Sequence, residues 1–360
     1  MTQDELYMNR CIELARRGAG QVAPNPMVGS VLVHDGKIIG EGYHKQFGKP
    51  HAEVNCIASV NKEDKSLIHQ STLYVSLEPC AHHGKTPPCA DLIIEKKIRK
   101  VVVGCRDPFV RVDGKGIEKL QKAGVEVIVG ILEKECIELN KRFIVFHTQH
   151  RPYIILKWAQ TLDGKIARAD YRRINISNEY TNRIVHRWRS EEMSILVGTN
   201  TVLYDDPELT TRNWPGQNPV RLILDRELKL PSSLKIFGGG PPTLVFNLLR
   251  NDLPPGKMNY SVLKDDSVNY YQITEDTEVV HQLLQALYQM NIQSVLVEGG
   301  NRLLQSFIDE KLWDEARVIT NESLSVGSGL PAPLLSDAIE EKQEKIFSDL
   351  ICYYKNNKIP

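Results

Sequence analysis

Three residues of the chain, His51, Cys80 and Cys89, have the types that form a zinc site. One imidazole and two thiolates supply three tetrahedral ligands and leave the fourth position for water. Glu53 follows the histidine by two residues, where a carboxylate outside the ligand set can take a proton from that water and return it to a leaving group. This set predicts one Zn²⁺ ion and a hydrolytic deaminase with Glu53 as its catalytic residue.

The segment between the two cysteines, residues 81–88, is longer than the two residues of a short Cys-x-x-Cys element. It contains His82, His83 and Lys85, and cationic groups there suit an anionic substrate such as a phosphate ester. Either histidine would also supply a fourth protein ligand. By the number of ligands, a structural zinc site is therefore the alternative to a catalytic one. The remaining cysteines lack such spacing and are expected to be ordinary thiols: Cys11, Cys56, Cys105, Cys136 and Cys352.

Length, charge and cysteine content narrow the class of protein. A chain of 360 residues favours two domains, and equal numbers of basic and acidic residues, 45 each, argue against a generally basic nucleic-acid surface. We find no signal-peptide core and no uncharged apolar run of membrane-spanning length. An odd number of cysteines, seven, indicates a reducing compartment. We therefore expect a cytoplasmic enzyme acting on a small molecule, with no nucleic-acid or membrane partner.

Alternating helices and strands are expected to position the zinc-site residues. Helices beginning just after His51 and near Cys80 and Cys89 would let both helix dipoles favour the thiolates. Asp35-Gly36 between two apolar runs predicts a hairpin. The first half as a whole reads as an α/β layered domain. Its expected helices are 3–17, 52–59, 89–96 and 116–123, and its expected strands are 28–33, 37–43, 72–76, 100–105 and 125–129.

The second half repeats the α/β pattern after a predicted linker at 147–152, which gives domains at 1–146 and 153–360. A mostly parallel sheet is expected. Lys157, at the end of the first strand, is either a snorkelling edge residue or a ligand to a phosphate or carbonyl. The expected strands are 153–157, 194–197, 220–224, 243–246, 294–297 and 316–320.

Two loops of the second half carry polar residues suited to chemistry. The loop 199–212 holds hydroxyls, carboxylates and an arginine, which would serve equally well as helix caps and turns. Glu298-Gly299-Gly300 ends an apolar strand and opens a helix, where backbone amides can receive phosphates. Because this is not the G-x-G-x-x-G fingerprint, a classical Rossmann domain is disfavoured.

Motifs along the first half together resemble a known family. They are Pro-Asn-Pro-Met-Val-Gly at 24–29, His51-Ala52-Glu53, the run 77–89 around both cysteines, and Asp107-Pro108 with Gly114-Lys115-Gly116. They resemble the deaminase half of the bifunctional RibD family of riboflavin biosynthesis. The resemblance implies a cytidine-deaminase-like three-layer α/β/α fold, zinc bound by His51, Cys80 and Cys89, and Asn25 in a pyrimidine pocket. From the residues alone, the Pro-Asn-Pro stretch is only a rigid loop.

Leu162-Asp163-Gly164-Lys165, Asp205-Asp206-Pro207 and Val297-Glu298-Gly299-Gly300 resemble the reductase half of the same family. That half implies a dihydrofolate-reductase-like α/β fold, NADPH as cofactor, and a homo-oligomer, dimer or tetramer, built through these domains. Lys157 and Asp205 are candidates for orienting the substrate or moving its proton. By position, the implied NADPH contacts are Ala159, Thr201, Asp205, Gly300, Asn301, Arg302 and Leu303. The implied contacts to the phosphorylated substrate are Arg189, Leu209, Arg212 and Glu298, and both arginines suit phosphate.

Two positions depart from the family pattern. Arg173-Ile174-Asn175 stands where the family has Ser-x-Trp, so an aromatic face that would pack on the cofactor is lost. Arg226 follows the Leu224-Asp225 strand end in place of a small hydroxyl residue, and we hypothesise that it pairs with the 2′-phosphate of NADPH.

The resemblance predicts two consecutive reactions. The first is zinc-dependent hydrolytic deamination of 2,5-diamino-6-ribosylamino-4(3H)-pyrimidinone 5′-phosphate, and the second is NADPH-dependent reduction of 5-amino-6-(5-phosphoribosylamino)uracil to the ribitylamino product. The alternatives are an active deaminase with an altered or inactive reductase half, a nucleic-acid-editing deaminase, and a non-catalytic zinc-stabilised binding module.

Overall fold

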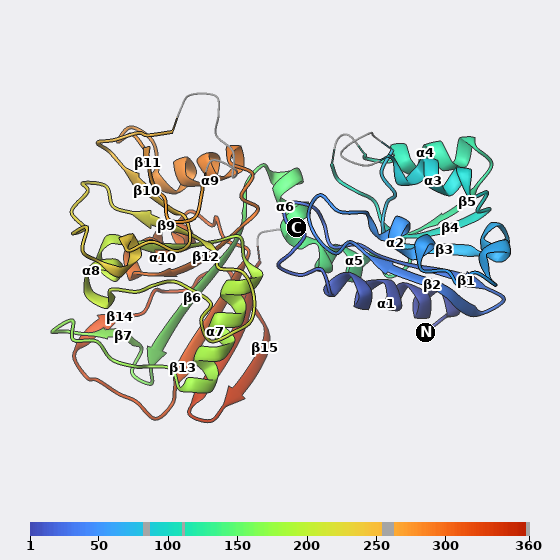
Figure 1. Ribbon diagram of the computed structural model, residues 1–360. Helices are drawn as coiled ribbons and strands as arrows, with labels where there is room; N and C mark the ends of the chain where they lie inside the picture. The colour runs from blue at the N-terminus through green and yellow to red at the C-terminus, as the bar shows by residue number, and fades with distance from the viewer. Residues whose placement is uncertain (82–86, 110–111, 254–262, 358–360) are drawn as a thin grey trace. The chain divides into compact units, whose positions relative to one another are not determined.

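The computed structural model describes residues 1–81, 87–109, 112–253 and 263–357. The chain forms two compact units, Met1–His150 and Arg151–Pro360 (Figure 1). The three cationic residues of the insertion between the cysteines lie outside the described residues. Among the residues that are described, no helix is long and apolar enough to cross a membrane.

A five-stranded sheet in the order β2-β1-β3-β4-β5 is the centre of the first unit. β1 is antiparallel to both β2 and β3, whereas β3, β4 and β5 run parallel. The β1–β2 turn has positive φ at both Asp35 and Gly36, as the predicted hairpin requires. The strands are β1 (Gly29–His34), β2 (Lys37–Tyr43), β3 (Thr72–Leu77), β4 (Lys100–Cys105) and β5 (Glu126–Val129).

Helices cover both faces of this sheet and give the predicted three layers (Figure 1). Val31 and Val33 pack with α1 (Gln3–Arg16) and α5 (Glu133–Leu139), whereas Leu32 between them packs with helices of the opposite face, because successive strand side chains alternate. That opposite layer consists of α2 (Ala52–Ala58), α3 (Cys89–Glu95) and α4 (Lys115–Lys122). A short 3₁₀ helix, η1 (Lys65–Gln70), precedes β3.

The boundary between the units differs in detail from the predicted linker at 147–152. Helix α6 (Lys141–Gln149) occupies the first half of that stretch, and His150 ends it in the left-handed conformation. Arg151 is buried and forms a bidentate pair with Asp314 at 2.6 and 2.7 Å, so the second half belongs to the second unit.

The second unit is built on a nine-stranded sheet in the order β11-β10-β9-β8-β12-β6-β13-β16-β15. Every pair from β11 to β13 is parallel, so the sheet is mostly parallel as predicted, and β16 and β15 extend it antiparallel at one edge. The strands are β6 (Tyr153–Thr161), β8 (Ser194–Gly198), β9 (Val220–Leu224), β10 (Thr243–Asn247), β11 (Val268–Gln272), β12 (Ser294–Gly299), β13 (Glu315–Asn321), β15 (Ala338–Ile346) and β16 (Asp349–Asn356). A separate pair joins β7 (Lys165–Arg168) to β14 (Gly329–Pro331).

The main core of the second unit lies between the sheet and two amphipathic helices, α9 (Val279–Gln289) and α10 (Asn301–Asp309). The other face carries α8 (Thr199–Asp205), whose Val202 packs on strand residues, and α7 (Glu179–Glu191). A 3₁₀ turn, η2 (Lys235–Phe237), follows β9.

Two sequence expectations are wrong here. β6 continues to Thr161, so Lys157 lies inside a strand at the centre of the sheet and not at an edge. The stretch 199–205, expected as part of a loop, is helix α8.

Candidate active sites

His51, Cys80 and Cys89 meet at the carboxyl end of β3, where the starts of α2 and α3 converge. His51 is the N-cap of α2 and Cys89 is the first residue of α3. Cys80 is not itself helical, contrary to the sequence expectation, but its sulfur accepts the backbone N–H of Cys89 at 3.3 Å. The helix-start environment predicted for both thiols is therefore present.

The three ligand atoms have the spacing of a tetrahedral zinc site. His51 Nδ1 lies 3.6 Å from Cys80 Sγ and 3.4 Å from Cys89 Sγ, and all three atoms lie within 4.8 Å of one another. Tetrahedral bonds of about 2.0–2.1 Å to nitrogen and about 2.3 Å to sulfur would separate N and S by about 3.6 Å. The residues present thus fit a zinc ion without rearrangement. Among the described residues this is the one such group of potential ligands.

Hydrogen bonding favours the ionised form of one of the two thiols, whereas hydrogen bonding to Cys80 and burial raise the pKa of the Cys89 thiol. Hydrogen bonds with Cys89 and with His51 lower the pKa of the Cys80 thiol. Glu53, in the first turn of α2, is buried, and burial raises its pKa to about 7. A carboxyl with such a pKa can both accept and donate a proton near neutral pH.

Asn25 is connected to the metal cluster through a histidine that the sequence analysis missed. His44 is buried, and its Nδ1 donates to the carbonyl oxygen of Pro50 at 3.1 Å, which leaves Nε2 to accept from Asn25 Nδ2 at 3.1 Å. Burial lowers the pKa of His44, which keeps it neutral. The rings of His44 and His51 lie 5.4 Å apart. A lone histidine after a strand carries no sequence signal for this contact.

In the second unit, a buried cluster of charges lies at the carboxyl ends of the central strands. Arg189 of α7 donates two hydrogen bonds of 2.7 Å each to the carboxylate of Glu298 on β12. Lys157 Nζ on β6 lies 3.8 Å from the same carboxylate. Burial opposes the charge of Glu298, but Arg189 and Lys157 together lower its pKa to about 2. Arg189, predicted as a phosphate ligand, therefore has a protein carboxylate as its partner.

Asp205, the last residue of α8, faces this cluster. Burial raises the pKa of Asp205, while the positive charges of Arg173 and Lys157 act in the opposite direction. Arg173, which stands where the family has a serine, thus lies close enough to interact with Asp205. Tyr204 stacks on Tyr171 with ring centroids 4.4 Å apart, which fastens the segment containing Arg173 to α8.

The predicted cofactor residues at the strand-to-helix turn lie next to α8. A Cβ added to Gly299 or to Gly300 would lie 3.2 Å from Thr201 Oγ1, so both glycines keep open a space beside that hydroxyl. Asn301 begins α10, and its buried Oδ1 has no hydrogen-bond partner among the described residues. The uncapped amides at the start of α10 suit the phosphates of NADPH, and the unpartnered oxygen of Asn301 can accept a hydrogen bond from a hydroxyl of the same cofactor.

The other residues predicted to contact NADPH or the substrate do not lie together in one cluster. Ala159 lies on β6 and is half-buried, Arg302 is exposed on α10, and Leu303 packs in the core, so its side chain is not available to a ligand. Leu209 is also buried, in the core beneath α8. Arg226 follows β9, has a side chain that is 49% exposed, and pairs with Glu275 at 3.6 Å.

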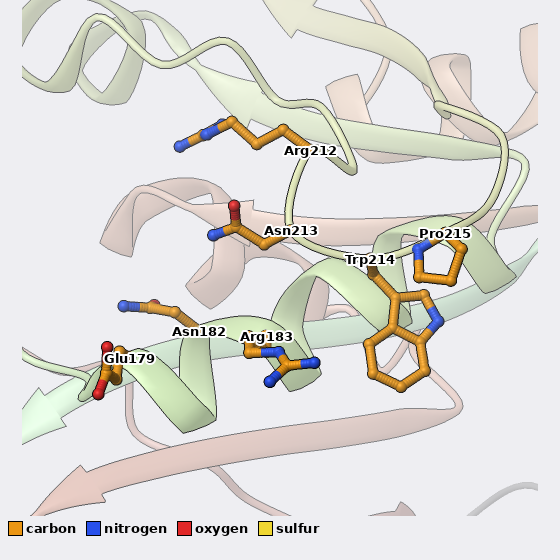
Figure 2. A pocket seen from close by; sticks show the side chains of 7 residues that line it. All are labelled: Glu179, Asn182, Arg183, Arg212, Asn213, Trp214 and Pro215. Atoms are coloured by element: carbon orange, nitrogen blue, oxygen red, sulfur yellow. The ribbon is translucent and has the colours of Figure 1, made fainter.

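Arg212 lines a pocket of about 660 Å³ beside α7. In Figure 2, Arg212 and Asn213 extend in the same direction as Asn182 of α7. Arg212 forms a 3.6 Å pair with Glu208, and both side chains are about half exposed. This arginine, unlike Arg189, keeps its guanidinium accessible to a ligand. The pocket is lined by Glu179, Asn182, Arg183, Arg212, Asn213, Trp214 and Pro215.

Each of the two units of the chain contains a region that matches a known protein family. Residues 1–105 match the cytidine and deoxycytidylate deaminase zinc-binding region, and residues 152–337 match the RibD C-terminal domain. The riboflavin biosynthesis protein RibD of Aquifex aeolicus is 40% identical over 98% of each chain, and that of Bacillus amyloliquefaciens is 38% identical over 95% of this chain and 90% of its own.

A solved structure is similar over the whole chain. It is a diaminohydroxyphosphoribosylaminopyrimidine deaminase/5-amino-6-(5-phosphoribosylamino)uracil reductase from Thermotoga maritima, with a TM-score of 0.86 and 38% identity, covering 98% of this chain and 99% of that one. Together with the zinc-type cluster and the second α/β unit, these matches show that the chain belongs to the RibD family of bifunctional deaminase/reductase enzymes of riboflavin biosynthesis.

Proposed function

We propose that the first unit hydrolytically deaminates 2,5-diamino-6-ribosylamino-4(3H)-pyrimidinone 5′-phosphate and that the second unit reduces the resulting 5-amino-6-(5-phosphoribosylamino)uracil with NADPH. We assign the deaminase to the unit that contains the predicted domain 1–146 and the reductase to the unit that contains the predicted domain 153–360. The similar protein from Thermotoga maritima is a deaminase/reductase of this kind, which supports the assignment. The observation that carries it is the ligand spacing of His51, Cys80 and Cys89, which suits zinc and supplies three ligands among the described residues.

In the deaminase site, zinc held by the three ligands would supply the Lewis acid that makes water a nucleophile at neutral pH. Glu53 accepts one proton from the attacking water and returns it to the ring nitrogen, and then carries the remaining hydroxyl proton to the leaving amino group. The ring carbon exchanges its C–N bond for a C–O bond, and ammonia departs with the transferred proton. We assign Asn25, whose amide is oriented by His44, to hydrogen bonding with the pyrimidine.

In the reductase site, NADPH would supply a hydride to C1 of the opened ribosyl group. Lys157 holds the proton that the adjacent nitrogen needs once that carbon has accepted the hydride. Its ammonium faces Glu298 and Asp205, whose charges counter the effect of burial on the pKa of Lys157. Burial nevertheless lowers the pKa of Lys157, and Arg189 acts in the same direction, so this lysine gives up its proton more readily than a free one while Glu298 orients its ammonium.

The remaining predicted contacts divide between cofactor and substrate. Thr201 and Gly300 border the space proposed for the NADPH phosphates, and Asn301 beside them can accept a hydrogen bond from a cofactor hydroxyl. We assign Arg226, two residues after β9, to the 2′-phosphate. Arg212 is the favoured ligand of the substrate phosphate because its guanidinium is accessible, whereas Arg189 positions Glu298.

We also propose that the chain forms a homo-oligomer through its second unit. The rings of Tyr180 and Phe347 lie 4.7 Å apart in a tilted arrangement, and the two residues are 48% and 71% exposed, which is an apolar patch suited to an interface. Light scattering after size-exclusion chromatography tests this, since Phe347→Glu should lower the mass. An unchanged mass would place the interface elsewhere.

The two sites are tested separately by supplying each substrate in turn. Glu53→Gln should lose about 10²–10⁴-fold in ammonia release from the diaminopyrimidine phosphate. The same variant should oxidise NADPH with the deaminated uracil substrate at the wild-type rate, because Glu53 lies in the other unit. Ammonia release by Glu53→Gln at the wild-type rate would contradict the proposed deaminase mechanism.

A further inference from the structure

Glu78 is a buried carboxylate close to the deaminase site that the catalytic scheme above does not use. It follows β3 directly, precedes Cys80 by two residues, and is 4% exposed. Its carboxylate accepts backbone N–H groups from a distant stretch of chain. Oε1 accepts from Gly116 at 2.9 Å and Ile117 at 3.2 Å, and Oε2 accepts from Gly114 at 3.0 Å and Asp107 at 3.4 Å.

These donors show that Glu78 caps the start of α4 from outside the helix. The first N–H groups of any α-helix have no partner within the helix. The N-cap of α4 is Gly114, in the left-handed conformation, and a glycine has no side chain with which to cap. Glu78 supplies the missing acceptor, and a carboxylate at the positive end of a helix dipole is favourable.

The start of α4 is also in direct contact with the metal-ligating segment. A Cβ added to Gly116 would lie 1.9 Å from the carbonyl oxygen of Pro79, so only glycine permits this approach. The backbone N–H of Glu78 donates to Cys105 at the end of β4 at 3.0 Å. The Glu78 junction, as we call these contacts, therefore joins the ends of β3 and β4 to the start of α4 beside Cys80.

We propose that Glu78 is a positioning residue of the deaminase, which holds the Asp107 backbone and the start of α4 in place as one wall of the substrate site. This inference rests on the deaminase function proposed above. Asp107 is buried and interacts electrostatically with Cys80, so this wall borders the metal cluster. Zinc ligation and proton transfer belong to other residues, so the junction acts on substrate binding and not on the chemical step.

Glu78→Gln is the direct test, because the amide keeps the shape but turns one acceptor oxygen into a donor facing two N–H groups. The KM for the diaminopyrimidine phosphate should rise about ten-fold, the equivalent of one lost hydrogen bond to a charged acceptor, while kcat changes less than about three-fold. Zinc content and reductase turnover should equal those of the wild type. Glu118→Gln, an exposed substitution in the first turn of α4, is the matched control and should change neither constant.

Amide hydrogen exchange tests the junction in the wild-type protein, without relying on a variant that folds. The amides of Gly116 and Ile117 should exchange at least about ten-fold more slowly than unprotected amides, and Glu78→Gln should remove that protection. Unprotected amides in the wild type, or an unchanged KM in a folded Glu78→Gln protein, would overturn the inference. A fall in kcat with loss of zinc would also overturn it, since Glu78 would then support metal binding. Failure of the wild type to release ammonia would instead refute the deaminase proposal.

Discussion

Replacing Glu298 by Gln should destabilise the second unit by about 3 kcal/mol. The substitution removes the one carboxylate that contacts Arg189 at 2.7 Å and Lys157 at 3.8 Å, although both cationic side chains are only 13% exposed. Lowering the pKa of Glu298 from 4.5 to about 2 corresponds to about 3 kcal/mol of unfolding free energy near neutral pH. Independently of the pKa, removing one member of a buried ion pair typically lowers the free energy of unfolding by about 3–5 kcal/mol. The two estimates therefore agree.

Intrinsic tryptophan fluorescence in urea measures this unit alone. The four tryptophans, Trp158, Trp188, Trp214 and Trp313, all lie after residue 150, so unfolding of the first unit does not contribute to the tryptophan signal. Glu275→Gln is the matched control, because Glu275 is 76% exposed and its pair with Arg226 is long. That control should change the free energy of unfolding by less than about 0.5 kcal/mol.

The pH dependence gives an independent check on the electrostatic origin. A carboxylate whose pKa is depressed in the folded state stabilises the fold above its unfolded pKa, near 4.5, and loses that contribution as the pH falls toward about 2. The difference between wild type and Glu298→Gln should therefore be constant above about pH 5.5 and shrink below about pH 4.5. A difference below about 1 kcal/mol at neutral pH, or one independent of pH, would refute the reasoning.

Three further predictions concern the ligands. Arg226→Ala should weaken the binding of 2′,5′-ADP, measured by calorimetry, by about 10-fold because one charge-assisted hydrogen bond is lost. Its affinity for 5′-AMP should stay unchanged. Equal losses for both nucleotides would be inconsistent with a 2′-phosphate contact. Chelation of zinc should abolish ammonia release and leave NADPH oxidation with the deaminated substrate intact, and restored activity on adding zinc completes the test. Arg212→Ala should raise the KM for the phosphorylated uracil substrate about 10-fold or more, with little change for its dephosphorylated analogue; a similar rise for both compounds would argue against a phosphate contact.

The sequence indicates the metal cluster because its ligand types are chemically specific and two of the three, His51 and Cys89, lie at the starts of helices that apolar patterns also indicate. It does not reveal the Glu78 junction or the contact of Asn25 with His44, since these depend on loops that meet only in the folded unit. Arg189 was predicted as a phosphate ligand, but Glu298, 109 positions away, is its partner in the fold. Such non-local pairings carry no signal in a single sequence.

Local propensity also misleads in two elements. The residues of α8, Thr-Asn-Thr-Val-Leu-Tyr-Asp at 199–205, include several poor helix formers, so a loop was expected. The run Glu-Glu-Lys-Gln-Glu-Lys within β15 consists of good helix formers and did not indicate a strand. Tertiary pairing with β16 decides its conformation, and charged residues on an edge strand discourage pairing with other chains.

The most direct test of two active sites in one chain follows both reactions at once. Purified zinc-loaded protein is given NADPH and the diaminopyrimidine phosphate as the only pyrimidine, while absorbance at about 340 nm and released ammonia are recorded together. We predict equal amounts of ammonia released and NADPH oxidised, with ammonia appearing first. NADPH oxidation without ammonia, or ammonia without any NADPH oxidation, would contradict the account.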